Sequence, residues 1–227
     1  MFIPLKDLNP RRSFPAITIL LIAANIAVFA YQVSLPVRAA KPFLMAYADV
    51  PSRLPALFTG HATAAQALLP LVTSMFLHGG ILHLLGNMLF LWIFGDNVED
   101  FFGHFGYLLF YFVCGIVASL AHDFSDLSSQ LPALGASGAI SGVMGAYLVL
   151  FPRARVLTLV FIFLLPIPAV ILLGWWFILQ FLGGLSTAGM RAAGGVAWWA
   201  HVGGFLVGII LLQVFPKEPV RYPRSNV

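Results

Sequence analysis

A serine and a histidine, each inside a long apolar stretch, are the residues of this sequence best suited to chemistry. Ser137 stands in Gly-Ala-Ser-Gly, and His201 stands in Ala-His-Val-Gly-Gly. Polar and ionisable side chains within a membrane are costly and commonly face a functional interior. An imidazole can take the proton of a hydroxyl group and so activate a serine. Either residue alone is better explained by helix packing, whereas the pair indicates nucleophilic catalysis.

Small residues flank both members of the pair at helical spacing. Glycines four residues apart allow two helix backbones to approach closely. We therefore expect a tight crossing that brings the Ser137 hydroxyl and the His201 imidazole toward hydrogen-bonding distance. The glycines concerned are Gly135, Gly138, Gly142, Gly145, Gly204 and Gly208.

A third group lies in the segment from His78 to Asn87. His83 and Asn87 are four residues apart, so a helix projects both side chains from one face. Neutral imidazole and carboxamide groups can donate hydrogen bonds to a developing negative oxygen, each worth about 3 to 4 kcal/mol in a transition state. The structural alternative is a hydrogen bond between helices. We expect His78 to be structural.

The acidic residues lie outside the bodies of the expected spans, so none is available to orient His201. A serine hydrolase with this sequence is expected to use a Ser-His dyad rather than a triad. We expect the acids between the second and third spans to cap and hydrate the turn there. The eight acids are Asp7, Asp49, Asp96, Glu99, Asp100, Asp123, Asp126 and Glu218.

The elements that position these residues are expected to be membrane helices. Hydrophobic residues make up 60% of the chain, charged residues 9%, and the mean hydropathy is +0.95. The charges leave six long apolar runs, each able to supply the ~20 residues that cross a bilayer as a helix. The fold class is therefore an all-α polytopic bundle. The expected spans are Phe14–Val33, Ile81–Phe94, Phe105–Ala121, Ser137–Phe151, Val156–Leu182 and Val196–Phe215.

The positive charges orient this bundle. Eight Lys and Arg residues fall in the segments that face inward if the amino terminus is inside, and four fall in the outer ones. This asymmetry predicts both termini in the cytoplasm. The first span is expected to remain as an anchor rather than be removed as a signal peptide. We divide the chain into a cytoplasmic segment 1–13, a six-span domain 14–215 and a cytoplasmic tail 216–227.

Other features are expected to be structural. Cys114 is alone and cannot form an internal disulfide. Five prolines in the connection 34–80 argue against one long helix, and its apolar character favours the membrane interface. Pro166 and Pro168 are expected to kink the fifth span, which could help a substrate to enter sideways. The tryptophans are expected to anchor spans at the interface; these are Trp175, Trp176, Trp198 and Trp199.

Together these residues resemble the rhomboid intramembrane serine proteases. The resemblance rests on His-x4-His-x3-Asn from His78 to Asn87, Gly-x-Ser-Gly from Gly135 to Gly138, and Ala-His-x-x-Gly-x3-Gly from Ala200 to Gly208. The three motifs occur in the order and on the spans typical of the family. The resemblance covers residues 9–215 and is to the compact six-span bacterial form.

The resemblance implies a role for each matched residue. Ser137 is then the nucleophile and His201 the general base, while His83, Asn87 and the Ser137 amide form the oxyanion hole. It also implies a site that opens outward and substrates that are single-span membrane proteins, often with a small residue before the cut bond. Neither a metal nor an organic cofactor is expected, and nucleic acid is not an expected partner because a basic stripe with interleaved aromatics is missing.

The sequence departs from the family pattern at two places. Ser141 occupies a position four residues after the nucleophile where an aromatic ring often stacks on the catalytic histidine, so other groups must hold His201. The Trp-Arg pair common in the first outer loop has no counterpart near Leu69-Pro70. The second departure concerns how that loop sits in the membrane and leaves the dyad unaffected.

Two other classes of function remain open on the sequence. A catalytically silent rhomboid-like protein would bind client helices, but such proteins commonly lack the serine or the histidine. A transporter or metal channel could use the histidines as ligands, although carboxylates are missing from the spans. We expect an integral protein of a bacterial cytoplasmic membrane, in contact with the lipid bilayer and with single-span substrates.

Overall fold

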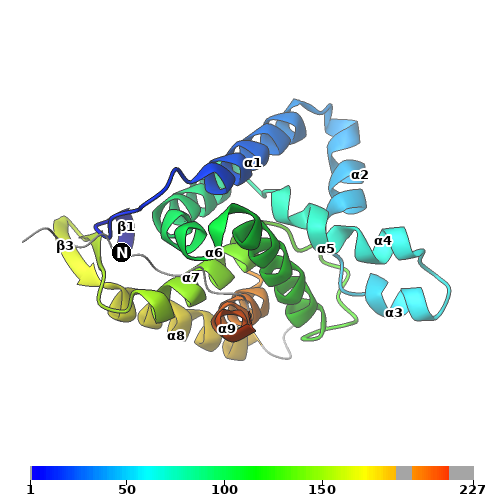
Figure 1. Ribbon diagram of the computed structural model, residues 1–227. Coiled ribbons are helices and arrows are strands. Elements are labelled where there is room, and N and C mark those ends of the chain that lie inside the picture. Colours follow the sequence, from blue (N-terminus) through cyan, green and yellow to red (C-terminus); the bar gives the residue numbers. More distant parts are fainter. Residues whose placement is uncertain (1, 188–195, 215–227) are drawn as a thin grey trace, which may run out of the picture.

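The computed structural model describes residues 2–187 and 196–214, and it is a helical bundle with a small sheet at one end (Figure 1). The expected all-α polytopic class is confirmed for the bundle. The long helices are α1 (Ala16–Ser34), α6 (Ile81–Asp123), α7 (Ser137–Leu150), α8 (Ala169–Thr187) and α9 (Trp198–Val214). The tail 216–227 lies outside the described residues.

Helix α6 is two apolar segments joined at a sharp bend. Gly103 interrupts it with φ of 68°, a left-handed value that glycine adopts without strain. The second expected span therefore continues past Phe94 to the residues before Gly103. Among the described helices, α1, α6 and α8 are long and apolar enough to cross a membrane, whereas α7 and α9 are shorter. That the chain crosses the membrane six times stays a prediction.

Helix α7 lies at the centre of the bundle, in contact with α6, α8 and α9 (Figure 1). Every residue from Gly138 to Tyr147 is buried, which is the pattern of a helix surrounded on all sides. A Cβ added to Gly204 would lie 2.1 Å from the Gly138 carbonyl oxygen, and one added to Gly208 would lie 2.1 Å from that of Gly142. The expected tight crossing of α7 and α9 is therefore present.

The expected start of the fifth span is wrong. Residues Arg155–Val160 and Phe163–Pro168 form strands β2 and β3 of an antiparallel hairpin, and helix α8 begins only at Ala169. Strand β1 (Phe2–Asp7) pairs with β2, which gives the sheet order β1-β2-β3. The prolines at 166 and 168 lie in β3, at an edge where a missing N–H costs no ladder bond. They do not kink α8, so the suggested role of a kink in substrate entry loses its basis.

The acids before Gly103 cap a different helix from the one expected. Glu99 is buried and accepts hydrogen bonds from the backbone amides of Ile17 and Thr18, at 2.9 and 2.8 Å. Asp100 accepts from the amides of Arg12 and Ser13. Glu99 thus satisfies unpaired N–H groups at the start of α1, where negative charge is favourable, and Asp100 holds the segment that leads into the helix. The expected hydrated cap at the turn into the third span is therefore wrong for Glu99.

The connection after α1 folds into short helices, as its prolines predict. They are α2 (Val37–Tyr47), α3 (Arg53–Phe58), α4 (Ala64–Leu68), α5 (Pro70–Thr73) and the 3-10 turn η1 (Ser74–Phe76). In Figure 1 they extend from one side of the bundle. Gln66 completes a capping box with Thr63 at the start of α4.

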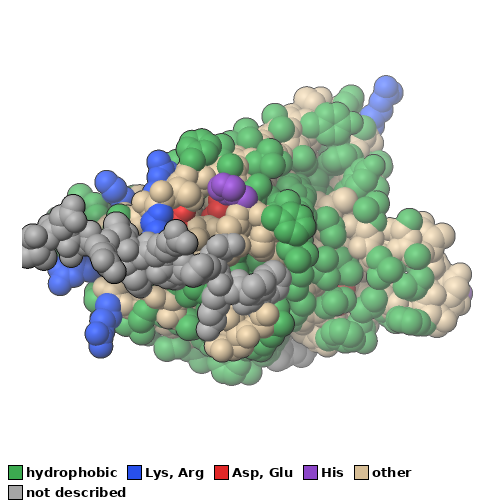
Figure 2. Space-filling view, viewed as in Figure 1, with side chains coloured by type: hydrophobic (Ala, Val, Ile, Leu, Met, Phe, Trp, Pro, Cys, Tyr) green, Lys and Arg blue, Asp and Glu red, His purple; other side chains and the backbone are tan. Residues whose placement is uncertain are grey.

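Hydrophobic side chains cover much of the molecular surface. Figure 2 shows them across the face in view, while Lys and Arg gather mainly at the end that carries the sheet. Large apolar side chains on α1 and α8 are exposed, including Leu20 at 58% and Ile171 at 61%. An apolar surface of this extent requires a lipid environment. The protein is therefore an integral membrane protein.

Candidate active site

Ser137 is the first residue of α7 and follows a turn made by Gly135. Gly135 has φ of 124°, which L side chains rarely adopt, and its amide donates to the Ser74 carbonyl oxygen at 2.9 Å. The turn delivers Ser137 to the helix start, where backbone N–H groups have no partner inside the helix. The hydroxyl and the free amide therefore lie together at the positive end of α7.

His201 of α9 completes a serine–histidine pair. Its Nε2 lies 2.8 Å from Ser137 Oγ, and its Nδ1 lies 2.7 Å from Gln180 Oε1 on α8. A carboxamide oxygen only accepts hydrogen bonds, so the Nδ1 atom carries the imidazole proton. Nε2 is then free to accept the proton of the serine hydroxyl. The group that fixes the tautomer is an amide rather than a carboxylate.

A tryptophan supports the imidazole from the side. The Trp176 ring lies 5.8 Å from the His201 ring between centroids, inclined at 39°, and it also packs on Phe205. Trp176 is partly buried and packs against the core beside His201, while its expected role as an interface anchor stays a prediction. Ser141 does not contact the imidazole through any described hydrogen bond; its hydroxyl donates to the Ser137 carbonyl oxygen at 2.6 Å. Gln180 and Trp176 thus hold the His201 ring, which in many family members is covered by an aromatic side chain at the position of Ser141.

His83 faces the turn that precedes the nucleophile. The backbone amide of Gly79 donates to His83 Nδ1 at 3.4 Å, which places the ring proton on Nε2. A Cβ added to Gly135 would lie 2.8 Å from His83 Nε2 and 3.5 Å from Asn87 Nδ2. Glycine is therefore required at position 135 for two reasons: the backbone has a positive φ, and the His83 ring lies where a side chain would be. Two N–H donors of α6 converge above the turn.

His78 fixes the orientation of the Asn87 side chain. Asn87 Nδ2 lies 2.9 Å from His78 Nε2, and burial lowers the pKa of His78 to about 4. His78 is therefore neutral, so its Nε2 can accept one amide hydrogen and leave the second free. Gln32 of α1 in turn binds the His78 backbone at both its N–H and its carbonyl oxygen. These contacts agree with the structural role expected of His78.

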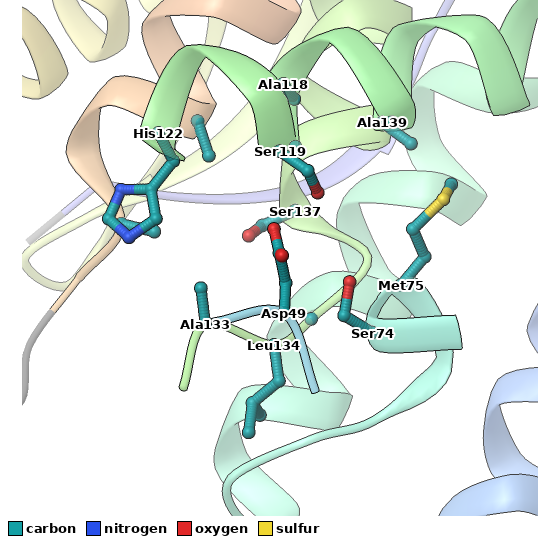
Figure 3. Close-up of a pocket in the computed structure, with 15 residues that line it drawn as sticks. Asp49, Ser74, Met75, Ala118, Ser119, His122, Ala133, Leu134, Ser137 and Ala139 are labelled. Atoms are coloured by element: carbon teal, nitrogen blue, oxygen red, sulfur yellow. The ribbon is translucent and has the colours of Figure 1, made fainter. Parts of the chain in front are cut away.

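A cavity lies on the other side of the nucleophile. It holds about 30 Å³ of water-accessible space, enough for a water molecule. Figure 3 shows the side chains of Ser137, Asp49, Ser119 and His122 around it. A water placed here would lie beside the serine hydroxyl. Among the described residues, no group of three His, Cys, Asp or Glu side chains is placed to hold a metal ion.

The structure brings together all four residues predicted for the site. Ser137, His201, His83 and Asn87 converge from α7, α9 and α6 at the start of α7. Gln180 and Gln32 were not among the residues predicted from the sequence. Gln180 is the only Gln, Asn, His or charged residue in the run from Val156 to Gly189, and that isolation was a usable signal. Gln32 sits at the end of its span, where a polar residue needs no special explanation.

Comparison with known proteins agrees with these motifs. Residues 65–218 match the sequence model of the Rhomboid domain. The chain is 33% identical over 150 residues to Rhomboid protein 1, mitochondrial, of Saccharomyces cerevisiae, covering 62% of this chain and 40% of that protein. It is 31% identical over 163 residues to Presenilin-associated rhomboid-like protein A, mitochondrial, of Danio rerio, covering 67% and 39%.

A bacterial protein gives a shorter match at higher identity. Rhomboid protease GluP of Bacillus subtilis is 46% identical over 78 residues, which cover 34% of this chain and 15% of that protein. The aligned regions thus span less than half the length of each of these three relatives.

Proposed function

Because the chain belongs to the rhomboid family, we propose that it is an intramembrane serine endopeptidase that cuts the transmembrane segments of single-span membrane proteins. The observation that carries the proposal is the chain of hydrogen bonds from Gln180 through His201 to Ser137. It prepares the hydroxyl for deprotonation inside a bundle whose surface faces lipid. The name of one relative, Rhomboid protease GluP, agrees with this activity.

The first half of the reaction forms an acyl-enzyme. Ser137 Oγ attacks the scissile carbonyl carbon while its proton passes to His201 Nε2. The carbonyl oxygen becomes negative and accepts hydrogen bonds from His83 Nε2–H, the free Asn87 N–H and the Ser137 amide. The tetrahedral intermediate then collapses, the C–N bond breaks, and the Nε2 proton goes to the leaving amine.

The second half releases the other product. A water from the cavity beside Ser137 attacks the ester carbonyl and gives its proton to His201 Nε2. The C–O bond to Ser137 breaks and the serine oxygen recovers the proton. Each oxyanion donor contributes about 3 to 4 kcal/mol to the two transition states. The mechanism uses neither metal nor cofactor.

The proposal includes a location and an orientation. We place the protein in a bacterial cytoplasmic membrane, with both termini in the cytoplasm and the start of α7 toward the outer side. The positions of the Lys and Arg residues support this orientation.

The test is cleavage of a single-span reporter in lipid vesicles. Ser137→Ala and His201→Ala are each expected to lower the turnover by about 1,000-fold or more, because the dyad acts as a unit. Ser186→Ala and His61→Ala serve as matched controls, since both side chains are exposed and hydrogen-bond within their own segments, to Gly183 and Thr59. Equal product from the dyad variants and wild type would refute the proposal and favour a client-binding role.

A further inference from the structure

Two aspartates of different segments share a buried contact behind the nucleophile. Asp49 follows α2 and is 2% exposed, and Asp123 ends α6 and is 1% exposed. The two carboxyl groups lie close enough to interact with each other, and the Ser119 hydroxyl interacts with Asp49. Two ionised carboxylates would repel each other in this buried place, and a proton shared between them would relieve the repulsion.

Two buried oxygens of the pair favour a shared proton. Asp49 Oδ2 and Asp123 Oδ1 are buried and meet no other N–H or O–H donor among the described residues. Buried polar atoms without partners are costly, and a proton between two carboxyl groups supplies the missing donor. The cavity beside Ser137 is lined by Asp49 and by His122, the neighbour of Asp123 (Figure 3).

The backbone at Asp49 is fastened to the loop that leads into α7. The Asp49 amide donates to the Ala133 carbonyl oxygen at 3.0 Å, and the Ala133 amide donates back at 2.7 Å. The Ser52 amide donates to the Ser129 carbonyl oxygen at 3.0 Å. Gly135 follows two residues after Ala133. The carboxyl pair thus ties the end of α6, the Asp49 segment and the approach to Ser137 into one unit.

We propose that Asp49 is a positioning residue, which shares a proton with Asp123 and so holds Gly135 beneath His83 and Ser137 beside His201. This inference rests on the proposed protease function. When the pair loses its proton, two negative charges lie side by side in a buried place, and the segment must move to separate or hydrate them. Catalysis then falls while the dyad residues themselves remain unchanged.

The charges around the pair decide when the proton leaves. Burial raises the pKa of Asp49 to about 6, against the lowering effects of the Ser119 hydroxyl and the Arg53 guanidinium. Arg53 of α3 is partly engaged elsewhere, since it donates to the carbonyl oxygens of Met45 and Ala48. His122 of α6 faces the cavity, and Asp126 lies near enough to His122 to interact with its charge.

The raised pKa of Asp49 determines whether the pair is lost toward acid or toward alkaline pH. A carboxyl group whose pKa is raised on folding stabilises the fold below its ordinary pKa, and that contribution is lost as the pH rises through the raised value. Once Asp49 is ionised near pH 6, the proton left on the pair is harder to remove because a like charge lies beside it. The loop is therefore held in neutral solution and released on the alkaline side.

The experiment compares pH profiles of reporter cleavage in vesicles from about pH 5 to about pH 10. Asp49→Asn keeps a hydrogen-bond donor toward Asp123 without an ionisable proton, so the alkaline fall in kcat of wild type is expected to vanish. Asp49→Ala is expected to lower kcat about tenfold at neutral pH, with KM changed less than about twofold. Asp126→Asn, the same change on the adjoining loop, is expected to keep the alkaline fall and at most to displace it in pH, because Asp126 interacts with the charge of His122.

Labelling of Ser137 by a fluorophosphonate separates the possible failures. If wild type neither cleaves the reporter nor reacts with the probe, the protease proposal fails. If wild type is active but Asp49→Asn keeps the same alkaline fall, or Asp49→Ala retains full kcat, the positioning role of Asp49 is refuted. Thermal unfolding of each variant identifies a loss of activity that comes from misfolding, and in that case the Asn variant decides.

Discussion

In the proposed mechanism, His201 depends as a base on two residues of α8, Gln180 and Trp176. Gln180 accepts the Nδ1 proton and Trp176 covers the ring, so the imidazole has one tautomer and one orientation. In the well-known serine protease triads a buried carboxylate has this task. An uncharged amide costs less to bury, which suits a site surrounded by a membrane bundle.

Replacing Gln180 tests this assignment at the scale of one residue. Gln180→Leu keeps the volume but removes the acceptor, so both imidazole tautomers become available and Nε2 is protonated in part of the population. We expect kcat to fall about 10- to 100-fold, equivalent to ~1.4 to 2.7 kcal/mol. Gln180→Glu retains an oxygen acceptor and is expected to keep more activity than the leucine variant. Equal rates for wild type and Gln180→Leu in vesicles would show that Gln180 does not orient the base.

At the scale of elements, the crossing of α7 and α9 sets the distance between serine and histidine. The two backbones touch at Gly138 and Gly204, and again at Gly142 and Gly208, because neither pair has side chains between the helices. Three facing glycines on α7 alone would cost helix stability in water, but tight packing compensates for it in a bundle. The dyad geometry is thus a consequence of backbone contact.

Filling this contact is expected to destabilise the protein. A methyl group at Gly204 would lie 2.1 Å from the Gly138 carbonyl oxygen, so Gly204→Ala must force the helices apart. We expect a loss of about 1 to 3 kcal/mol in the free energy of unfolding, with a parallel loss of cleavage. Gly174→Ala on α8 is the matched control, because nothing lies within 4 Å of its added methyl group. Thermal unfolding in detergent measures both, and equal midpoints would contradict the prediction.

At the scale of the whole molecule, contacts between distant segments place the connections between helices at two ends of the bundle. Strand β1 pairs with β2, so the amino-terminal segment lies at the same end as the connection between α7 and α8. Asp49 pairs with Ala133, so the connection after α1 lies at the same end as the one after α6. These pairings fit an alternating path through a membrane, and most described Lys and Arg residues lie at the sheet end.

Cysteine labelling in intact cells tests the orientation. In a Cys114→Ser background, Ser128→Cys on the loop before α7 is expected to react with a membrane-impermeant maleimide. Leu5→Cys on β1 is expected to react only after the cells are opened, because the positively charged end remains in the cytoplasm. Both side-chain positions are exposed, so accessibility within the protein is matched. The opposite labelling pattern would reverse the topology.

The sequence by itself determined the membrane class, the family and the four residues that converge. Hydropathy and small-residue spacing are local properties, and they carry over directly into helices and their crossing. Local sequence patterns mispredict a segment where contact with a distant partner decides its structure. Residues 155–168 are apolar enough for a span, yet pairing with β1 makes them a hairpin. Glu99 has an ionisable side chain, yet it is buried because unpaired backbone amides at the start of α1 donate hydrogen bonds to it.

The tertiary structure alone decided what holds the site in place. Gln180 lies beside His201 and Asp49 beside Asp123, and each pair comes from segments whose separation in sequence gives no sign of contact. A buried polar group needs a partner, and only the packed fold specifies which one it meets. The residues proposed to react could therefore be read from local motifs, whereas the residues that support them depend on how the helices pack.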